Sequence, residues 1–462
     1  MKKLLFMAAF LLPMTAKAQL GSLVENPANG DKGNIVRVWQ GKEKVLSYGR
    51  VGLNQHTVNA FCLSDYSNIY LSAPPSPVLT IQCADLSAIL SAQVNPRLTD
   101  IRDMTIVDDY VFFCGDAVDT TYPPTSTDVI GWFKLADFSS STINLNYFEI
   151  PQNTASYLKR IAAYPSGQGG FTVLALGEDI NFTDYIFEIK NVTATTSLSV
   201  DYRQFSASSY WVKEAADDIL VTDEDVFVVG NNRTTANGFQ LCIRRTDRNI
   251  GITSPQFNLR YDYIASGYEV NANTHSTLTE DNIIATSYVH APTSTSFTTR
   301  LRLIDPTSMD MINSQEYLID EKWEPEGIVY VDIPRKLVIL QENADQWFFT
   351  ELDPFNNHQY MANIMYHQDQ EFHSLDSDHK DMFVSAGIKH FLYFHNLFMP
   401  LPTSTRCPEN KDVMIDPIDN IVKSWIYIPF APPQIFVNEV QVQVPVSGIN
   451  SVPFCDSPLN LK

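Results

Sequence analysis

Residues 103–115 read DMTIVDDYVFFCG, and a related stretch, DILVTDEDVFVVG, returns at residues 218–230. In each copy an acidic turn, Asp108-Asp109 or Asp223-Glu224-Asp225, stands before a short apolar run that ends in Gly. An apolar run between acidic residues and glycine is typical of a strand in a hairpin. Because the same pattern returns far along the chain, it predicts a repeat architecture built from strands.

Units of this kind recur along the chain, each marked by an apolar residue in its central strand. The markers recur every 42 to 62 residues, which is near the period of about 40–50 residues that four-stranded propeller blades have. Within a unit, an apolar strand is followed by an alternating strand that ends in Asp, as in residues 300–305 (RLRLID). Such alternation predicts a half-exposed outer strand. The markers are Ile69, Val111, Val173, Val226, Ile283, Leu337 and Met382.

Over residues 35 to about 400 the chain resembles β-propeller proteins in the spacing and internal order of these units. The sequence lacks the WD dipeptide, double-glycine and aspartate-box repeats of particular propeller families. The resemblance implies an all-β fold, a single β-propeller with seven blades, over residues 19–400. A pair of β-sandwich domains, which also have short strands and turns, is the alternative. Residues 85–93 and 157–163 are each expected to form at most a turn or two of helix.

The tail, residues 401–462, does not repeat the unit. It contains two predicted strands, residues 424–430 and residues 435–444 (IFVNEVQVQV), separated by a turn rich in proline. We expect these strands to complete blade one or blade seven, so that N- and C-terminal strands close the ring and remove its exposed edges. A small appended module is the alternative.

Residues 1–18 have the pattern of a bacterial signal peptide, with Lys2 and Lys3 before a short apolar core and Ala16-Lys17-Ala18 as the cleavage site. We therefore expect an exported protein of Gram-negative type, in the periplasm, on the cell surface or secreted. No later stretch approaches 18 apolar residues, which predicts no membrane insertion. The net charge of −21 opposes binding to nucleic acid. We expect a monomer.

The six cysteines form no CxxC motif. Four of them lie in apolar runs and are expected to be small buried hydrophobic residues: Cys62, Cys83, Cys114 and Cys242. Cys407 and Cys455 lie in the loop-rich tail, and an oxidising compartment would allow them to form a disulfide.

Histidines and carboxylates gather at His367, Asp369, Glu371 and His373. A spacing of two places side chains on one side of an extended strand, as metal ligands require. The alternative is a solvated loop between blades, and no metal or other cofactor is predicted overall. No nucleophile elbow, HExxH or phosphate-binding loop occurs, so no catalytic residue is assigned.

Aromatic residues near predicted strand ends offer surfaces for stacking on sugars, with packing between blades as the alternative. They are Trp39, Tyr210, Trp211, Tyr288 and Trp323. The leading hypothesis is an exported, non-enzymatic propeller that binds a protein or glycan partner through one end face. The alternative is a polysaccharide hydrolase or lyase with its site at the mouth of the central channel. A third hypothesis is a purely structural surface component.

Overall fold

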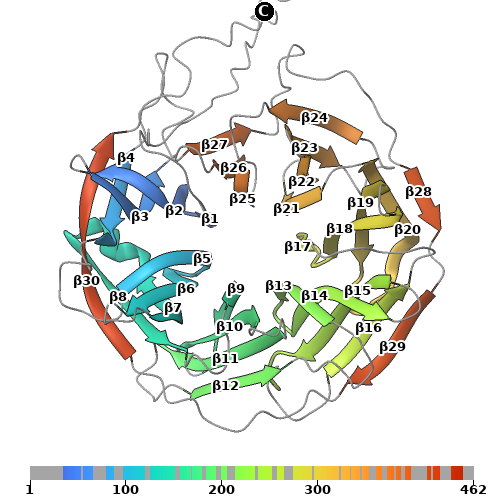
Figure 1. Ribbon diagram of the computed structural model, residues 1–462, viewed down its shortest axis with the longest axis horizontal. Helices are drawn as coiled ribbons and strands as arrows, with labels where there is room; N and C mark the ends of the chain where they lie inside the picture. Colours follow the sequence, from blue (N-terminus) through green and yellow to red (C-terminus); the bar gives the residue numbers. More distant parts are fainter. Residues whose placement is uncertain are drawn as a thin grey trace, which may run out of the picture.

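The computed structural model has groups of antiparallel strands arranged in a ring around a central axis (Figure 1). It describes residues 35–450 apart from residues 54–55, 66–79, 88–96, 120–124, 151–156, 168, 179–183, 194–198, 205–213, 235–237, 252–257, 265–273, 294–295, 322–323, 333–334, 344–345, 353–359, 367–371, 379–380, 387–390, 397–413, 418–419 and 427–438. The fold is an all-β propeller, as predicted from the sequence. The predicted signal peptide and the predicted boundary at residue 400 lie outside the described residues.

Consecutive strands pair with one another in groups, which we number in chain order. Group one contains β1 (Ile35–Trp39), β2 (Lys44–Leu53), β3 (His56–Asp65) and β4 (Thr80–Asp85). Group two contains β5 (Arg97–Val107), β6 (Tyr110–Asp119), β7 (Thr125–Lys134) and β8 (Thr142–Glu149). Group three contains β9 (Tyr157–Pro165), β10 (Phe171–Glu178), β11 (Asp184–Val192) and β12 (Ser199–Gln204). A short 3-10 helix, η1 (Leu135–Ser139), follows β7.

The second half of the ring repeats this arrangement. Group four contains β13 (Glu214–Val221), β14 (Asp225–Thr234), β15 (Gly238–Asp247) and β16 (Asn258–Ile264). Group five contains β17 (His275–Leu278), β18 (Ile284–Thr293), β19 (Ser296–Ile304) and β20 (Met311–Glu321). Group six contains β21 (Glu324–Val331), β22 (Lys336–Asn343), β23 (Gln346–Leu352) and β24 (Tyr360–Tyr366). Group seven contains β25 (Phe372–Ser377), β26 (Asp381–Ala386) and β27 (Phe391–Asn396). The predicted number of blades stays a prediction, which these groups support.

The hydrophobic core lies between the groups, because each sheet packs its two faces against its two neighbours. One core cluster, for example, joins Phe112 and Ile130 of group two to Val173 and Phe187 of group three. Residues of the second strand in a group are therefore buried on both sides, and β10 is buried over seven consecutive positions. Continuous burial of this kind favours the near-unbroken apolar runs that the sequence shows at each marker.

The prediction that residues 300–304 form a half-exposed strand is wrong. Leu301, Arg302 and Leu303 are all buried in β19. The guanidinium carbon of Arg302 lies 4.8 Å from the centre of the Tyr288 ring. Both faces of this sheet are covered by neighbouring groups, so both sets of alternating side chains are buried. The leucines pack on one face, and Arg302 stacks on an aromatic ring on the other.

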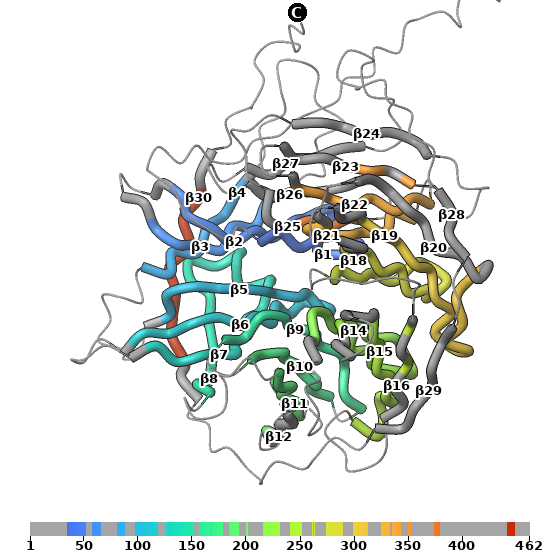
Figure 2. Tube along the Cα trace, turned by 45° about the vertical axis from the view of Figure 1, so that its right-hand side comes forward, coloured from blue at the N-terminus to red at the C-terminus, as the bar shows by residue number. Residues whose placement is uncertain are grey.

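The tail strands extend the outer edges of four groups. β28 (Met414–Pro417) pairs with β20 of group five, and β29 (Asn420–Ile426) pairs with β16 of group four. β30 (Glu439–Asn450) pairs first with β8 of group two and then with β4 of group one (Figure 2). As predicted, the tail alternates there: Val442 and Val444 are buried, while Gln441 and Gln443 are exposed. Group one thus combines N-terminal strands with a C-terminal strand, as predicted, whereas the expectation for residues 424–430 is wrong, because β29 pairs with group four and not with group one or seven.

The junction between the last and first groups is formed by β25 against β1, without strand pairing between them among the described residues. Asp376 Oδ2 accepts a hydrogen bond from the Val38 backbone N–H at 2.7 Å. Ser374 Oγ accepts one from the Val36 N–H at 3.3 Å. Gln40 Nε2 donates to the Ser377 carbonyl at 2.9 Å. The ring is therefore closed by side-chain hydrogen bonds to the backbone.

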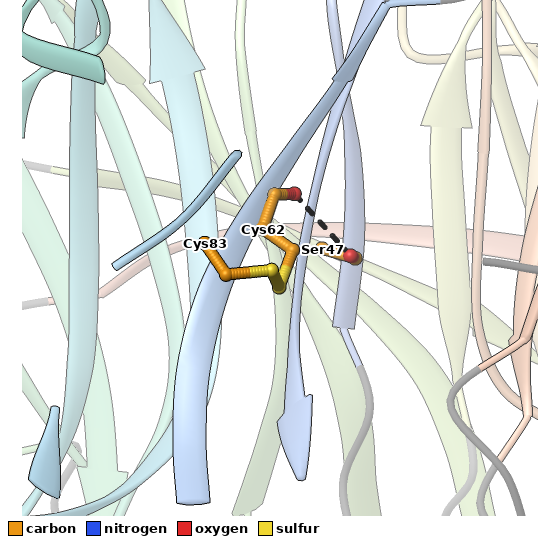
Figure 3. Close-up of a disulfide and its surroundings, with 3 residues drawn as sticks. All are labelled: Ser47, Cys62 and Cys83. Atoms are coloured by element: carbon orange, nitrogen blue, oxygen red, sulfur yellow. Dashed lines mark hydrogen bonds between the residues drawn. A yellow bond between two sulfur atoms is a disulfide. The ribbon is translucent and has the colours of Figure 1, made fainter. Parts of the chain in front are cut away.

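Cys62 and Cys83 form a disulfide between β3 and β4 (Figure 3), so their interpretation as unpaired hydrophobic residues is wrong. The two cysteines stand directly opposite each other in the antiparallel register, which brings their side chains together. Ser47 Oγ donates to the Cys62 carbonyl at 3.4 Å. Cys114 and Cys242 are free and buried, as predicted. Cys407 and Cys455 lie outside the described residues, and their pairing stays a prediction.

Candidate functional site: the central channel and its rim

A cavity of about 520 Å³ lies on the axis of the ring. It is lined by the first strand of every group: β1, β5, β9, β13, β17, β21 and β25. Ligand pockets in proteins typically measure about 300–1,000 Å³. The channel is therefore the first place to look for a site, and the side chains of these seven strands decide its chemistry.

Five of the seven channel strands carry a β-bulge near their beginning. In each, the register with the second strand skips one residue. The extra residues are Arg102, Lys159, Asp217, Glu326 and His373. Bulges re-aim side chains and are enriched beside functional sites. We call Arg102, Lys159, Asp217 and Glu326 the rim, since each is the extra residue of a bulge in a channel strand.

Ion pairs fix the two basic residues of the rim in equivalent ways. Arg102 contacts Asp116 on the second strand of its group, and its Nη1 lies 2.8 Å from Asp128 Oδ1 on the third strand. Lys159 Nζ lies 3.7 Å from Glu178 on the second strand of its group and 2.7 Å from Asp184 on the third.

The acid on the third strand also reaches the next group in both cases. Asp128 Oδ1 accepts a hydrogen bond from the Leu158 N–H of group three at 3.2 Å. Asp184 Oδ2 accepts one from the Ala216 N–H of group four at 2.9 Å. Each ion-pair cluster therefore holds a rim residue and joins two groups of strands at the same time.

One aromatic ring lies on this rim. The guanidinium carbon of Arg102 is 4.0 Å from the centre of the Tyr157 ring, at the beginning of β9. Tyr157 has a relative exposure of 46%, and Ile250 is the other exposed large hydrophobic residue among those described. Ile250 follows β15, in the turn where Arg248 N–H bonds to the Glu224 carbonyl between β13 and β14. Since successive strands run antiparallel, Tyr157 and Ile250 lie on opposite end faces of the ring.

Carboxylates deeper in the channel accept hydrogen bonds from backbone N–H groups. Asp103 Oδ1 accepts hydrogen bonds from the Met104 N–H at 2.9 Å and from Arg37 Nη2 at 2.5 Å. Asp103 Oδ2 accepts the Ile161 N–H of group three at 2.9 Å. Both oxygens of this carboxylate therefore serve to join channel strands.

Asp218 repeats the arrangement in the next pair of groups. Its Oδ1 accepts the Ile219 N–H, and its Oδ2 accepts the Ser276 N–H of group five, both at 2.9 Å. Ser377 Oγ donates to the Tyr330 carbonyl at 2.7 Å, which joins groups seven and six. Asp103, Asp218 and Asp376 thus act as latches between neighbouring groups.

Several titratable groups in this region depart from their ordinary behaviour. Burial raises the pKa of Asp217 to about 7, against the opposing effect of Lys159. Burial likewise raises the pKa of Asp218 and of Asp116 to about 6 in each case. Burial, together with the charge of Arg160, lowers the pKa of His275 to about 3. Perturbed pKa values cluster at functional sites and also at structural ion pairs, so geometry must decide between the two.

The predicted metal ligands are only partly within the described residues. His367, Asp369 and Glu371 lie outside them, and His373 is described only as the extra backbone residue of the bulge in β25. Within the part of the chain that the structure describes, no group of three or more His, Cys, Asp or Glu side chains could hold a metal. The metal site stays a prediction.

Two of the predicted aromatic residues are buried and so are not available for stacking on a sugar. Tyr288 is buried beside Arg302, and Trp39 is buried in the core between groups one and two. Both support the alternative, which is packing between blades. Tyr210, Trp211 and Trp323 lie outside the described residues.

The sequence analysis missed the rim, although a local signal marks it. At these bulges two apolar residues that face the same side are separated by two residues and not by one. Examples are Ile101-Arg-Asp-Met104 and Leu158-Lys-Arg-Ile161. The ends of these stretches are buried: Ile101, Met104, Leu158 and Ile161. Such a break in the two-residue alternation, repeated at the beginning of successive units, indicates a bulge.

No family model matches the chain, and no curated protein matches it. Among solved structures, BamB from Moraxella catarrhalis is 9% identical, with a TM-score of 0.37, and the match covers 83% of this chain and 100% of that one. The Nup133 β-propeller domain from Vanderwaltozyma polyspora is 8% identical, with a TM-score of 0.34, covering 83% and 99%. No helix among the described residues is long and apolar enough to cross a membrane.

Proposed function

We propose that the protein is an exported, non-enzymatic propeller that binds a protein or glycan partner through one end face. The observation that carries this proposal is the state of the channel carboxylates. Asp103, Asp218 and Asp376 each use both oxygens to accept backbone N–H groups. A general acid or nucleophile must reach substrate with a carboxyl oxygen, whereas in each of these carboxylates Oδ1 accepts the N–H of the following residue and Oδ2 accepts an N–H of the neighbouring group.

The end face on which the bulges lie is the face we propose for binding. There Arg102, which lines the channel, is held by ion pairs and lies against the exposed ring of Tyr157. The disulfide between Cys62 and Cys83 supports export, because disulfides persist in oxidising compartments.

The test is an assay of residues 19–462 against an array of glycans and against polysaccharides, with product analysis, followed by capture of partners from the native cell envelope. We expect binding of a glycan or a protein, and no product. The protein would instead be the hydrolase or lyase if it released product from a polysaccharide. That release should then be abolished by changing a carboxylate that pairs with the rim, such as Asp116.

A further inference from the structure

We infer that Tyr157 and the ion-paired Arg102 form a binding subsite for a neutral oligosaccharide at the rim of the channel. This inference rests on the proposed function and deepens it, since it selects glycan over protein and names the end face.

The ring of Tyr157 is held in a fixed orientation. One face lies over the Arg102 guanidinium at 4.0 Å, and Arg102 is itself fixed by Asp116 and Asp128. The relative exposure of the side chain is 12% for Arg102 and 2% for Asp128, so neither side chain has much room to adopt another conformation. An aromatic ring that is already ordered loses little conformational freedom when a ligand stacks on it.

The rest of Tyr157 remains accessible, with a relative exposure of 46%. The face of an aromatic ring is electronegative, and it attracts the slightly positive C–H groups on the flat side of a pyranose. Because Tyr157 lies against Arg102, which lines the cavity, the exposed part of its ring is available to a ligand that binds there. Within the described residues, no other large aromatic side chain is exposed in this way.

Hydrogen-bonding groups for sugar hydroxyls are linked to Tyr157 through Arg102 and Glu178. Glu178 stands opposite Tyr157 in the ladder between β9 and β10, and its side chain is 30% exposed. Asp116 is 19% exposed and Lys159 18% exposed. Charged groups that are ordered and partly accessible make strong hydrogen bonds to hydroxyls.

Charge selects a neutral glycan over an acidic one. The rim clusters contain Asp116, Asp128, Glu178 and Asp184 against Arg102 and Lys159, and the chain carries a net charge of −21. An acidic polysaccharide would be repelled both locally and at longer range. The channel behind the rim, about 520 Å³, has room for a sugar unit at the end of the bound segment.

The test uses the full chain without residues 1–18 and measures affinity for cellohexaose, xylohexaose and mannohexaose, with oligogalacturonate as the acidic comparison. We expect at least one neutral probe to bind and oligogalacturonate not to bind. Tyr157→Ala should weaken the affinity about tenfold, as expected for the loss of an aromatic contact, whereas Tyr157→Phe should stay within about twofold. Ile250→Ala, the matched control on the opposite face, should leave affinity unchanged. Equal thermal midpoints would show that each variant folds.

The remaining outcomes overturn the inference in distinguishable ways. Failure of every neutral probe to bind, while a protein partner is captured, overturns the glycan subsite and leaves the proposed function standing. Neutral binding that Tyr157→Ala does not weaken, or that Ile250→Ala weakens equally, places the glycan elsewhere. Conversion of a bound probe to product overturns the proposed function itself.

Discussion

The junction between groups two and three differs from the junction between groups seven and one. In the first, Asp103 accepts the Ile161 N–H of group three, and the same carboxylate also accepts the Met104 N–H of its own strand and Arg37 Nη2 of group one, while Asp128 accepts the Leu158 N–H. In the second, the hydrogen bonds are spread over Ser374, Asp376 and Gln40. Groups two and three are consecutive in the chain, whereas residues 338 positions apart meet at the closure.

The difference indicates which junction needs several independent hydrogen bonds. Between consecutive groups the chain itself limits separation, and there Asp103 concentrates bonds to three channel strands on one carboxylate. At the closure no short connection holds the groups together, and loss of one bond leaves the others in place. We therefore expect the interior latch to be the more sensitive to substitution, and the closure to show its weakness as local opening.

Asp103→Ala should have the largest effect, lowering the free energy of unfolding by about 4 kcal/mol. The substitution leaves Arg37 without its buried partner and two backbone N–H groups without an acceptor. Urea unfolding of the two proteins measures the difference. Asp223→Ala is the matched control, because this Asp is fully exposed in its ion pair with Arg248 and should change stability by less than about 0.5 kcal/mol. A loss at Asp103 no larger than at Asp223 would contradict the latch.

Loss of the Cys62–Cys83 disulfide should lower the free energy of unfolding by about 3 kcal/mol, from the loop of 21 residues that it closes. This disulfide bears on the comparison of the two junctions because it links β3 to β4 in group one, which lies on one side of the closure. The double variant Cys62→Ala with Cys83→Ala should lose this stability and become indifferent to reductant. The unaltered protein should lose it only when reductant is added. Sensitivity of the double variant to reductant would point to a second disulfide.

Asp376→Ala should cost about 2 kcal/mol, since the Val38 and Ser377 N–H groups lose an acceptor while Ser374 and Gln40 still bridge the junction. Hydrogen exchange should show the change as faster exchange in β1 and β25, with β5 and β9 unaffected. Equal acceleration around the whole ring would mean that the closure does not open separately.

Asp217→Asn should have the smallest effect, and the size of this effect depends on pH. Because burial raises the pKa of Asp217 to about 7, the folded chain holds this proton more tightly than the unfolded chain, and stability from this group falls as pH rises from about 4 to about 7. Asparagine has no such proton, and its carbonyl can still accept the Asn231 Nδ2 hydrogen bond. The variant should therefore be more stable than the unaltered protein at pH 8, on the order of 1 kcal/mol.

The difference between the two proteins should be smallest near pH 4, where Asp217 is protonated in the folded chain and about half protonated in the unfolded chain. Asp218 and His275 titrate in both proteins, so the difference between the two stability curves isolates Asp217. Thermal unfolding followed from pH 4 to pH 8 measures it. A variant that is less stable at pH 8 would mean that the charge of Asp217 is needed by Lys159.

The strands and the ring were predictable because their residues obey simple rules. Val111, Val173 and Val226 are fully buried in second strands, as the apolar runs around them indicate. The strand formed by Tyr157–Pro165 was predicted as helix, and the bulge explains the error. The extra residue, Lys159, places buried Leu158 and Ile161 three positions apart, which is a helical spacing.

The candidate site was not predictable in the same way, because its parts meet only in three dimensions. Arg102, Asp128 and Tyr157 come from two groups, and nothing in their spacing along the chain indicates that they touch. The disulfide has the same origin: only the register of β3 against β4 places Cys62 opposite Cys83. The predicted metal ligands relied on alternation at a place where His373 interrupts it as the extra residue of a bulge.

The pairing of β30 with both β8 and β4 sets the order in which the molecule can be finished. Groups one and two are the first to be synthesised, yet their outer edges are covered by the last described strand to emerge. Until then β4 and β8 present open hydrogen-bonding edges, which pair readily with other chains. The last described strand therefore completes the first two groups. A chain that stops before residue 439 would leave the outer edges of groups one and two uncovered and prone to aggregation.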